Sequence, residues 1–412
     1  MTVRARRIVA ALLAVAVGVS ASIGVVTSAS AATAYTEPQE VAGAPVVPDE
    51  SVEYRGQLFF SGNGLDEWPS GKLYSFDGTS FTLIDSMYTD VTNLRVINDV
   101  LYFSAKAAGA WFVVAYDGTS VTQTGLESSY TSIEFIGYDT DILAIVQPDS
   151  ATYSLDYLVD GSVRTLGTFD FALGLTAFNG LAYFVATPTG GSGYQMDRTD
   201  GVLVEADVTD AGSNMLVWKN VLYMSKMAQN WVFTKVLPDL TTEPASDPAI
   251  EFAQHYTDAG DVMYFAGVRG LDEYVYSYDG TVATELPGGL DVVGDLTLFD
   301  GQLFATSLAA TVGVCEVGID GGGCESDVSD VYYFDGTSWV LTASAHNSLG
   351  GLITYQNRLY FQDGAKWMFI ERASLANTGL DLVPGVAFGS LLVLLGAAVV
   401  LWRRRIERVT TG

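Results

Sequence analysis

A turn followed by an apolar and aromatic strand recurs eight times along this chain of 412 residues. Successive copies are 39 to 43 residues apart, except that 56 residues separate the last two. The copies begin at Arg55, Asn98, Thr140, Asn179, Lys219, Gly260, Asp300 and Gln356. A period of about forty residues is typical of repeat architectures, in which each unit buries its apolar face against its neighbours.

A second signature, Asp-Gly, follows about twenty residues after the first in most units. It occurs at Asp77, Asp117, Asp160, Asp200, Asp279 and Asp335, whereas the fifth unit has Asp239 before Leu240 and the last unit lacks it. Asp-Gly between two alternating strands is a strong hairpin signal, because glycine accepts the positive φ that the turn requires. We interpret these turns as hairpins rather than calcium loops, since each offers a single carboxylate.

Each unit therefore predicts four short strands, and no helical periodicity lies between the two ends of the chain. Four short strands every forty residues predict an all-β fold, a β-propeller, over residues 51–372. The last unit has no fourth strand of its own, and residues 40–48, within the N-terminal segment 32–50, could supply it. We expect eight blades. Seven are the alternative, which would leave two C-terminal strands unplaced.

The repeat resembles kelch-type propellers in its period and in the placement of its turns. This resemblance covers residues 51–371 and implies the architecture only.

The composition excludes some classes of partner and site. The chain has 20 Lys and Arg against 48 Asp and Glu, a net charge of −28. Nucleic acid is not expected as a partner, because neutralising phosphates needs clustered basic residues. The two histidines and two cysteines do not have the spacing of a zinc site, and no cofactor is expected.

The N-terminus has the features of an export signal. Three arginines precede an uncharged run from Ile8 to Val26, and Ala29-Ser30-Ala31 follows. This order predicts a signal peptide over residues 1–31. An N-terminal membrane anchor is the alternative.

The C-terminal segment, residues 373–412, combines three parts. These are the pentapeptide Leu375-Ala376-Asn377-Thr378-Gly379, an apolar stretch at 382–402, and Arg403-Arg404-Arg405. The apolar stretch spans about 31 Å as a helix, enough to cross a bilayer, and the arginines indicate a cytoplasmic tail.

These parts, in this order, resemble the sorting signal of Gram-positive cell-wall proteins, in the LAxTG form of actinobacteria. The resemblance implies cleavage by a sortase between Thr378 and Gly379 and a covalent link from Thr378 to the peptidoglycan precursor. The expected location is extracellular and wall-anchored, reached through a membrane-inserted precursor. A plain membrane anchor is the alternative.

The seventh unit carries an insertion that holds both cysteines. Cys315 and Cys324 flank a Gly-rich turn in a chain expected to be exported, which predicts a disulfide-closed loop. A reactive thiol pair is the alternative. The insertion is rich in acids, which suit either a weak calcium site or a solvated loop: Asp320, Glu325, Asp327 and Asp330.

Connections between successive blades place an acid beside an aromatic residue. The candidate binding residues are Tyr88, Asp90, Glu127, Tyr130, Phe169 and Asp170. Aromatic faces with neighbouring carboxylates suit sugar recognition, while packing between blades is the simpler explanation. The two histidines, His255 and His346, lie in no motif with a nucleophile, so no catalytic residue is assigned.

These features lead us to expect a secreted, wall-anchored surface protein that binds a glycan or a protein without catalysis. The alternatives are a wall-tethered polysaccharide hydrolase or lyase, and a display scaffold without a ligand. A propeller fold is compatible with all three.

Overall fold

The computed structural model describes residues 35–44, 47–63, 71–209, 215–226, 232–237, 241–246, 250–270, 272–290, 292–308, 328–346, 351–364 and 366–373. Within these ranges every regular element is a β-strand. The same residues contain no helix long and apolar enough to cross a membrane. Several expectations lie outside the described residues: the signal peptide, the sorting motif Leu375–Gly379, the apolar stretch 382–402, and the pair Cys315 and Cys324. The propeller lies in a compact unit that ends at Arg372.

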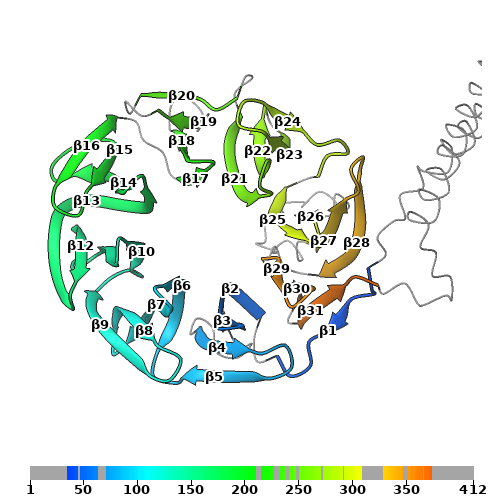
Figure 1. Ribbon diagram of the computed structural model, residues 1–412, viewed down its shortest axis with the longest axis horizontal. Coiled ribbons are helices and arrows are strands. Elements are labelled where there is room, and N and C mark those ends of the chain that lie inside the picture. The colour runs from blue at the N-terminus through cyan, green and yellow to red at the C-terminus, as the bar shows by residue number, and fades with distance from the viewer. Residues whose placement is uncertain are drawn as a thin grey trace, which may run out of the picture. The chain divides into compact units, whose positions relative to one another are not determined.

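The strands form eight blades around a ring (Figure 1), as expected. The first blade contains β2 (Val47–Tyr54), β3 (Gln57–Asn63), β4 (Lys72–Phe76) and β5 (Phe81–Asp85). The second contains β6 (Thr89–Ile97), β7 (Val100–Ala107), β8 (Ala110–Tyr116) and β9 (Val121–Ser128). The third contains β10 (Glu134–Tyr138), β11 (Asp141–Val146), β12 (Tyr153–Val159) and β13 (Ser162–Phe178). The fourth shares β13 and adds β14 (Leu181–Pro188), β15 (Gln195–Thr199) and β16 (Val204–Thr209).

The second half of the ring repeats this order. The fifth blade contains β17 (Leu216–Trp218), β18 (Val221–Lys226), β19 (Val232–Val236) and β20 (Thr242–Pro244). The sixth contains β21 (Glu251–Asp258), β22 (Met263–Arg269), β23 (Asp272–Tyr278) and β24 (Ala283–Glu285). The seventh contains β25 (Val293–Phe299), β26 (Gln302–Leu308), β27 (Val328–Phe334) and β28 (Trp339–His346). The eighth contains β29 (Ile353–Tyr355), β30 (Arg358–Asp363) and β31 (Lys366–Glu371), and its outermost strand is β1 (Gln39–Glu40).

The N-terminal segment thus closes the ring, but with a shorter strand than expected. Gln39 pairs with Phe369 and Glu40 with Met368, so β1 shares only Glu40 with the expected range of 40–48. Val47 begins β2, which pairs with β3 through the two-residue turn Arg55-Gly56. Because that turn sets the register of the hairpin, only residues before Val47 remain to pair with β31. The first blade therefore begins at Val47, four residues before the expected residue 51.

Apolar clusters join neighbouring blades. One cluster connects the first two blades through Tyr54, Phe59, Leu94 and Phe103. At the closing junction, Trp367 of β31 lies 4.7 Å from Tyr360 and 5.4 Å from Phe76 of the first blade, ring centre to ring centre. The core is therefore distributed between the blades, as a ring of stacked sheets requires.

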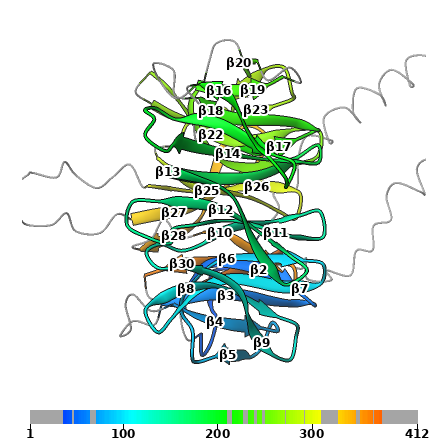
Figure 2. The ribbon, with the colours of Figure 1, turned by 90° about the vertical axis from the view of Figure 1, so that its left-hand side faces the viewer.

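The strands run between two faces of the ring (Figure 2), which differ in their connections. We call the turn face the one that carries the turns joining the first to the second and the third to the fourth strand of each blade. We call the loop face the one that carries the loops joining the second to the third strand and the connections between blades. This division follows from the antiparallel order of the strands.

Candidate functional site on the loop face

The Asp-Gly turns lie on the turn face, and their aspartates stabilise the turns. In Asp77, Asp117, Asp279 and Asp335 the Oδ1 atom accepts the N–H groups of the residues two and three positions later and a threonine hydroxyl. These hydrogen bonds lower the pKa of Asp279 to about 2, the N–H of Val282 having the largest effect. Within the described part of the chain, no group of three or more His, Cys, Asp or Glu residues is arranged to hold a metal ion.

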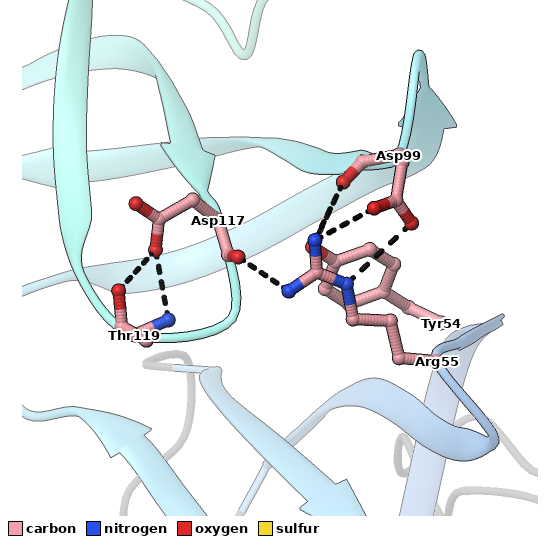
Figure 3. A network of polar contacts seen from close by, with 5 residues as sticks. All are labelled: Tyr54, Arg55, Asp99, Asp117 and Thr119. Atoms are coloured by element: carbon pink, nitrogen blue, oxygen red, sulfur yellow. Dashed lines mark hydrogen bonds and ion pairs between the residues drawn. The ribbon is translucent and has the colours of Figure 1, made fainter.

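Arg55 links the first two blades on the turn face (Figure 3). Its Nη2 lies 2.7 Å from Oδ2 of Asp99, and its Nη1 donates to the backbone oxygen of Asp117 at 2.7 Å. The hydroxyl of Tyr54 donates to the backbone oxygen of Asp99 at 3.0 Å. The residue that begins the first turn of a blade reaches the next blade in the same way at three other junctions: Asn98 to Thr140, Lys219 to Asp261, and Gln356 to Asp77. These polar groups of the turn face therefore hold blades in register.

A depression of about 580 Å³ on the turn face lies where the ring closes. Its two arginines face acidic partners, since Arg358 lies 3.3 Å from Glu371 and Arg372 lies 2.9 Å from Asp300. The cationic groups that line this depression are therefore paired with carboxylates of the chain itself.

Carboxylates of the innermost strands are also used between blades. Glu50 of β2 accepts the N–H groups of Asn93 and Leu94 of the second blade at 2.6 and 2.9 Å. Glu134 of β10 accepts two N–H groups of β13 at 2.8 and 2.7 Å. The donors are Gly174 and Leu175.

Asp295 of β25 accepts the N–H of Leu352 in the eighth blade at 2.7 Å. Burial raises the pKa of Glu50 and that of Asp295, and at Asp295 the N–H of Leu352 has the largest opposing effect. Each of these carboxylates accepts backbone N–H groups, and these hydrogen bonds align neighbouring blades.

Two of the aromatic residues predicted to bind a ligand are core residues. Tyr88 is 3% exposed and packs 6.3 Å from Phe103, and Phe169 is 6% exposed and packs 5.3 Å from Phe184. Packing between blades, the simpler explanation of the pattern, accounts for both. Neither ring is available for stacking against a sugar.

The remaining predicted residues lie at the surface of the loop face. Tyr130 is 56% exposed in the connection from the second to the third blade, and Glu127 is exposed near the end of β9. Asp90, half-buried at a bulge of β6, has a φ of 53° and accepts the hydroxyl of Thr89 at 3.2 Å. Asp170 is exposed in β13. Among the described residues, the ring of Tyr130 contacts no aromatic ring of the third or fourth blade.

Three aromatic rings of the third and fourth blades, none of them among the predicted binding residues, lie together on the loop face, where Phe171 contacts the other two. Phe171 of β13 lies 5.5 Å from Tyr153 of β12 and 5.4 Å from Tyr194, in the loop before β15. The rings meet edge to face, at 63° and 66°. Tyr194 is 40% exposed, and the other two are half-buried. We call these three residues the aromatic cluster.

A bulge at Asp170 makes this cluster possible. Phe169 pairs with Pro188 and Phe171 with Thr187, so Asp170 is the extra residue in β13. In a regular strand residues two apart share a face, whereas one extra residue reverses that relation. Phe169 therefore points into the core while Phe171 meets the surface rings.

The loop that carries Tyr194 is tied to β13. Oδ2 of Asp170 accepts the N–H of Gly190 at 2.9 Å, and the hydroxyl of Thr189 donates to the backbone oxygen of Thr168 at 3.1 Å. Gly190, with a φ of 71°, adopts a conformation that favours glycine. These contacts position Tyr194 against Phe171.

Comparison with known proteins supports the fold and no closer relationship. The sequence matches no model of a known protein family and no curated protein. Among solved structures, a prolyl endopeptidase is similar at a TM-score of 0.51 and 11% identity, over 80% of this chain and 55% of the other.

Two further similar structures are the β-propeller domain of the trilobed protease of Pyrococcus furiosus and the WD40 domain of SCAP from fission yeast. The first has a TM-score of 0.49 and 10% identity, over 72% of this chain and 98% of the other. The second has a TM-score of 0.47 and 10% identity, over 82% of this chain and 98% of the other. This chain spans about half the length of the prolyl endopeptidase. The chain is a β-propeller.

Proposed function

We propose that this propeller is displayed outside the cell, anchored to the wall through Thr378, and binds a glycan or a protein on its loop face without catalysis. Sortase and the peptidoglycan precursor are the partners of anchoring in this proposal. No cofactor is required, although assays with and without calcium test that part directly.

The observation that carries the binding function is the difference between the two faces. The polar groups of the turn face and the carboxylates of the innermost strands are hydrogen-bonded to neighbouring blades. The loop face instead presents exposed or half-buried aromatic rings, including Tyr130 and Tyr194. Exposed aromatic residues are typical of recognition surfaces.

The support for anchoring comes from the sequence of the tail together with the place where the propeller ends. Tyr35 and Arg372 form an antiparallel bridge, and β31 ends on the turn face of the eighth blade. Thr378 is six positions beyond Arg372, a reach of about 20 Å at most. A wall link at Thr378 would therefore keep the turn face close to the wall and leave the loop face free.

Anchoring is tested by replacing the residue that would form the link. In the Thr378→Ala variant, expressed in a sortase-bearing Gram-positive host, we expect the wall-bound fraction to fall and membrane-bound precursor to accumulate. Thr410→Ala, a matched change in the basic tail, should leave the distribution unchanged. Equal wall-bound fractions in both variants would contradict the proposal.

Binding is tested on residues 32–374, which include every strand of the closed ring. A glycan and protein-ligand screen is run beside a product assay on the same polysaccharides, with and without calcium. Binding without product is the expected result. Release of product would instead support the alternative of a wall-tethered polysaccharide hydrolase or lyase.

A further inference from the structure

We propose that the aromatic cluster, Tyr153, Phe171 and Tyr194, together with Asp170, is a binding site for an uncharged oligosaccharide. This inference rests on the binding half of the proposed function and gives it a location and a ligand class. The residues come from the third and fourth blades, which are neighbours in the propeller and share β13, so their side chains lie close together.

The rings offer the apolar half of such a site. Phe171 contacts both tyrosines, so the three rings form a row from β12 across β13 to the loop before β15, with Tyr194 as its exposed member. Sugar rings present C–H groups on their faces and hydroxyls on their edges. Tyrosine suits such ligands because it combines an apolar ring with a polar hydroxyl.

Asp170 supplies the polar half. It is the exposed, extra residue of the bulge and directly precedes Phe171 of the cluster in the chain. One of its oxygens, Oδ2, accepts the N–H of Gly190. Because an ionised carboxylate has two oxygens that accept several hydrogen bonds, Asp170 can also accept a sugar hydroxyl.

The charge of the chain argues for an uncharged ligand. With a net charge of −28, the molecule repels uronic acids, sialic acids and phosphate-bearing wall polymers over the range of its field. Uncharged hexose and N-acetylhexosamine units meet no such repulsion. Aromatic contact and carboxylate acceptors act on these sugars without requiring a basic residue.

The central experiment measures the affinity of residues 32–374 for uncharged oligosaccharides of glucose, mannose and N-acetylglucosamine by calorimetry. For the oligosaccharide that binds, Tyr194→Ala should weaken binding about tenfold, the loss of one aromatic contact. Tyr194→Phe, which keeps the ring, should retain most of the affinity. Asp170→Asn should weaken binding less than Tyr194→Ala.

Leu203→Ala is the matched control for removing an exposed apolar side chain. Leu203 is 64% exposed in the same blade but belongs to the turn face, so its replacement should leave binding unchanged. A thermal unfolding curve for each variant confirms that the propeller remains folded.

Three results would overturn this site. The first is affinity for the uncharged oligosaccharide that is unchanged in Tyr194→Ala. The second is binding that is lost in Tyr130→Ala and retained in Tyr194→Ala, which would move the site to the preceding connection. The third is binding only of acidic glycans or of proteins, which would refute the ligand class while leaving wall anchoring and binding on the loop face intact.

Discussion

Asp279 and Glu50 show that one chemical group serves two opposite purposes in this chain. Asp279 is exposed in a turn, where hydrogen bonds lower its pKa from 3.8 to about 2. Glu50 lies between blades, where burial raises its pKa above the ordinary 4.5 despite two backbone N–H donors. The first arrangement favours the charged form and the second disfavours it.

These two pKa shifts have opposite effects on how the free energy of unfolding depends on pH. A lowered pKa contributes stability above pH 3.8 that is lost as the pH falls through about 2, so Asp279 and the other turn aspartates favour acid unfolding. A raised pKa contributes stability below pH 4.5 that is lost as the pH rises through the folded value, as for Glu50. Stability should therefore rise from pH 2 to 4 and then decline.

Two substitutions separate these two effects. Asp279→Asn should flatten the rise between pH 2 and 4, and Glu50→Gln should flatten the decline above pH 4.5. The measurement is the free energy of unfolding in urea across this pH range. Glu37→Gln, at an exposed carboxylate, serves as the control. A curve whose slopes are the same in all four proteins would show that other groups dominate.

At the scale of the element, the short strand β1 completes the eighth blade and closes the ring. It pairs through Gln39 and Glu40 alone, but the residues around it add contacts. Tyr35 lies 5.1 Å from Phe304 of the seventh blade and donates its hydroxyl to Gln302 at 2.6 Å. Burial raises the pKa of Tyr35 to about 12, as expected for a phenol held in an apolar contact. The N-terminal segment therefore joins the seventh and eighth blades.

Removing Tyr35 should weaken ring closure in proportion to what is removed. Tyr35→Phe loses one hydrogen bond, about 1 kcal/mol of unfolding free energy. Tyr35→Ala also loses a half-buried ring, for about 2–3 kcal/mol in total. Deleting residues 32–41 should make the eighth blade the first site cut by limited proteolysis. Proteolysis that begins elsewhere in the deletion variant would show that the ring is held without this segment.

The repeat made much of the architecture predictable. Each turn of the Asn179-Gly180 kind has positive φ at both residues, 51° and 74°, so short hairpins and four strands for each unit follow from the residues themselves. The missing outer strand of the last blade likewise predicted closure by the N-terminal segment. Its position was less predictable, because two paired residues leave little trace in a sequence.

The candidate site was harder to predict because it depends on a bulge. Strand alternation puts Phe169 and Phe171 on the same side, and the structure puts them on opposite sides because Asp170 is the extra residue. No single residue type marks such a bulge. The contact from Phe171 to Tyr194 joins segments 23 residues apart, and it depends on the loop that Asp170 holds.

At the scale of the whole propeller, the proposed anchor implies an orientation. The propeller ends at Arg372 on the turn face, so a wall link at Thr378 would turn the aromatic cluster outward. We expect an epitope inserted after Gly161, on the turn face, to be shielded from antibody on intact cells. The same epitope inserted after Ser150, on the loop face, should be accessible. Both should be equally accessible after the wall is digested.

An opposite pattern, with the Gly161 epitope exposed and the Ser150 epitope shielded, would place the aromatic cluster against the wall. Such a result would restrict its ligands to the cell's own polymers. Equal exposure on intact cells would show that the tether permits free rotation.

β31 is flanked by β30 on one side and by β1 on the other. Tension applied to the chain beyond Arg372 would run along the length of this strand rather than across it. Hydrogen bonds on both sides would then share the load and break together in shear, instead of one after another as an edge strand peels. If a cell were held to a surface through this molecule, the tension would act on β31, which the N-terminal segment of the chain pairs with through β1.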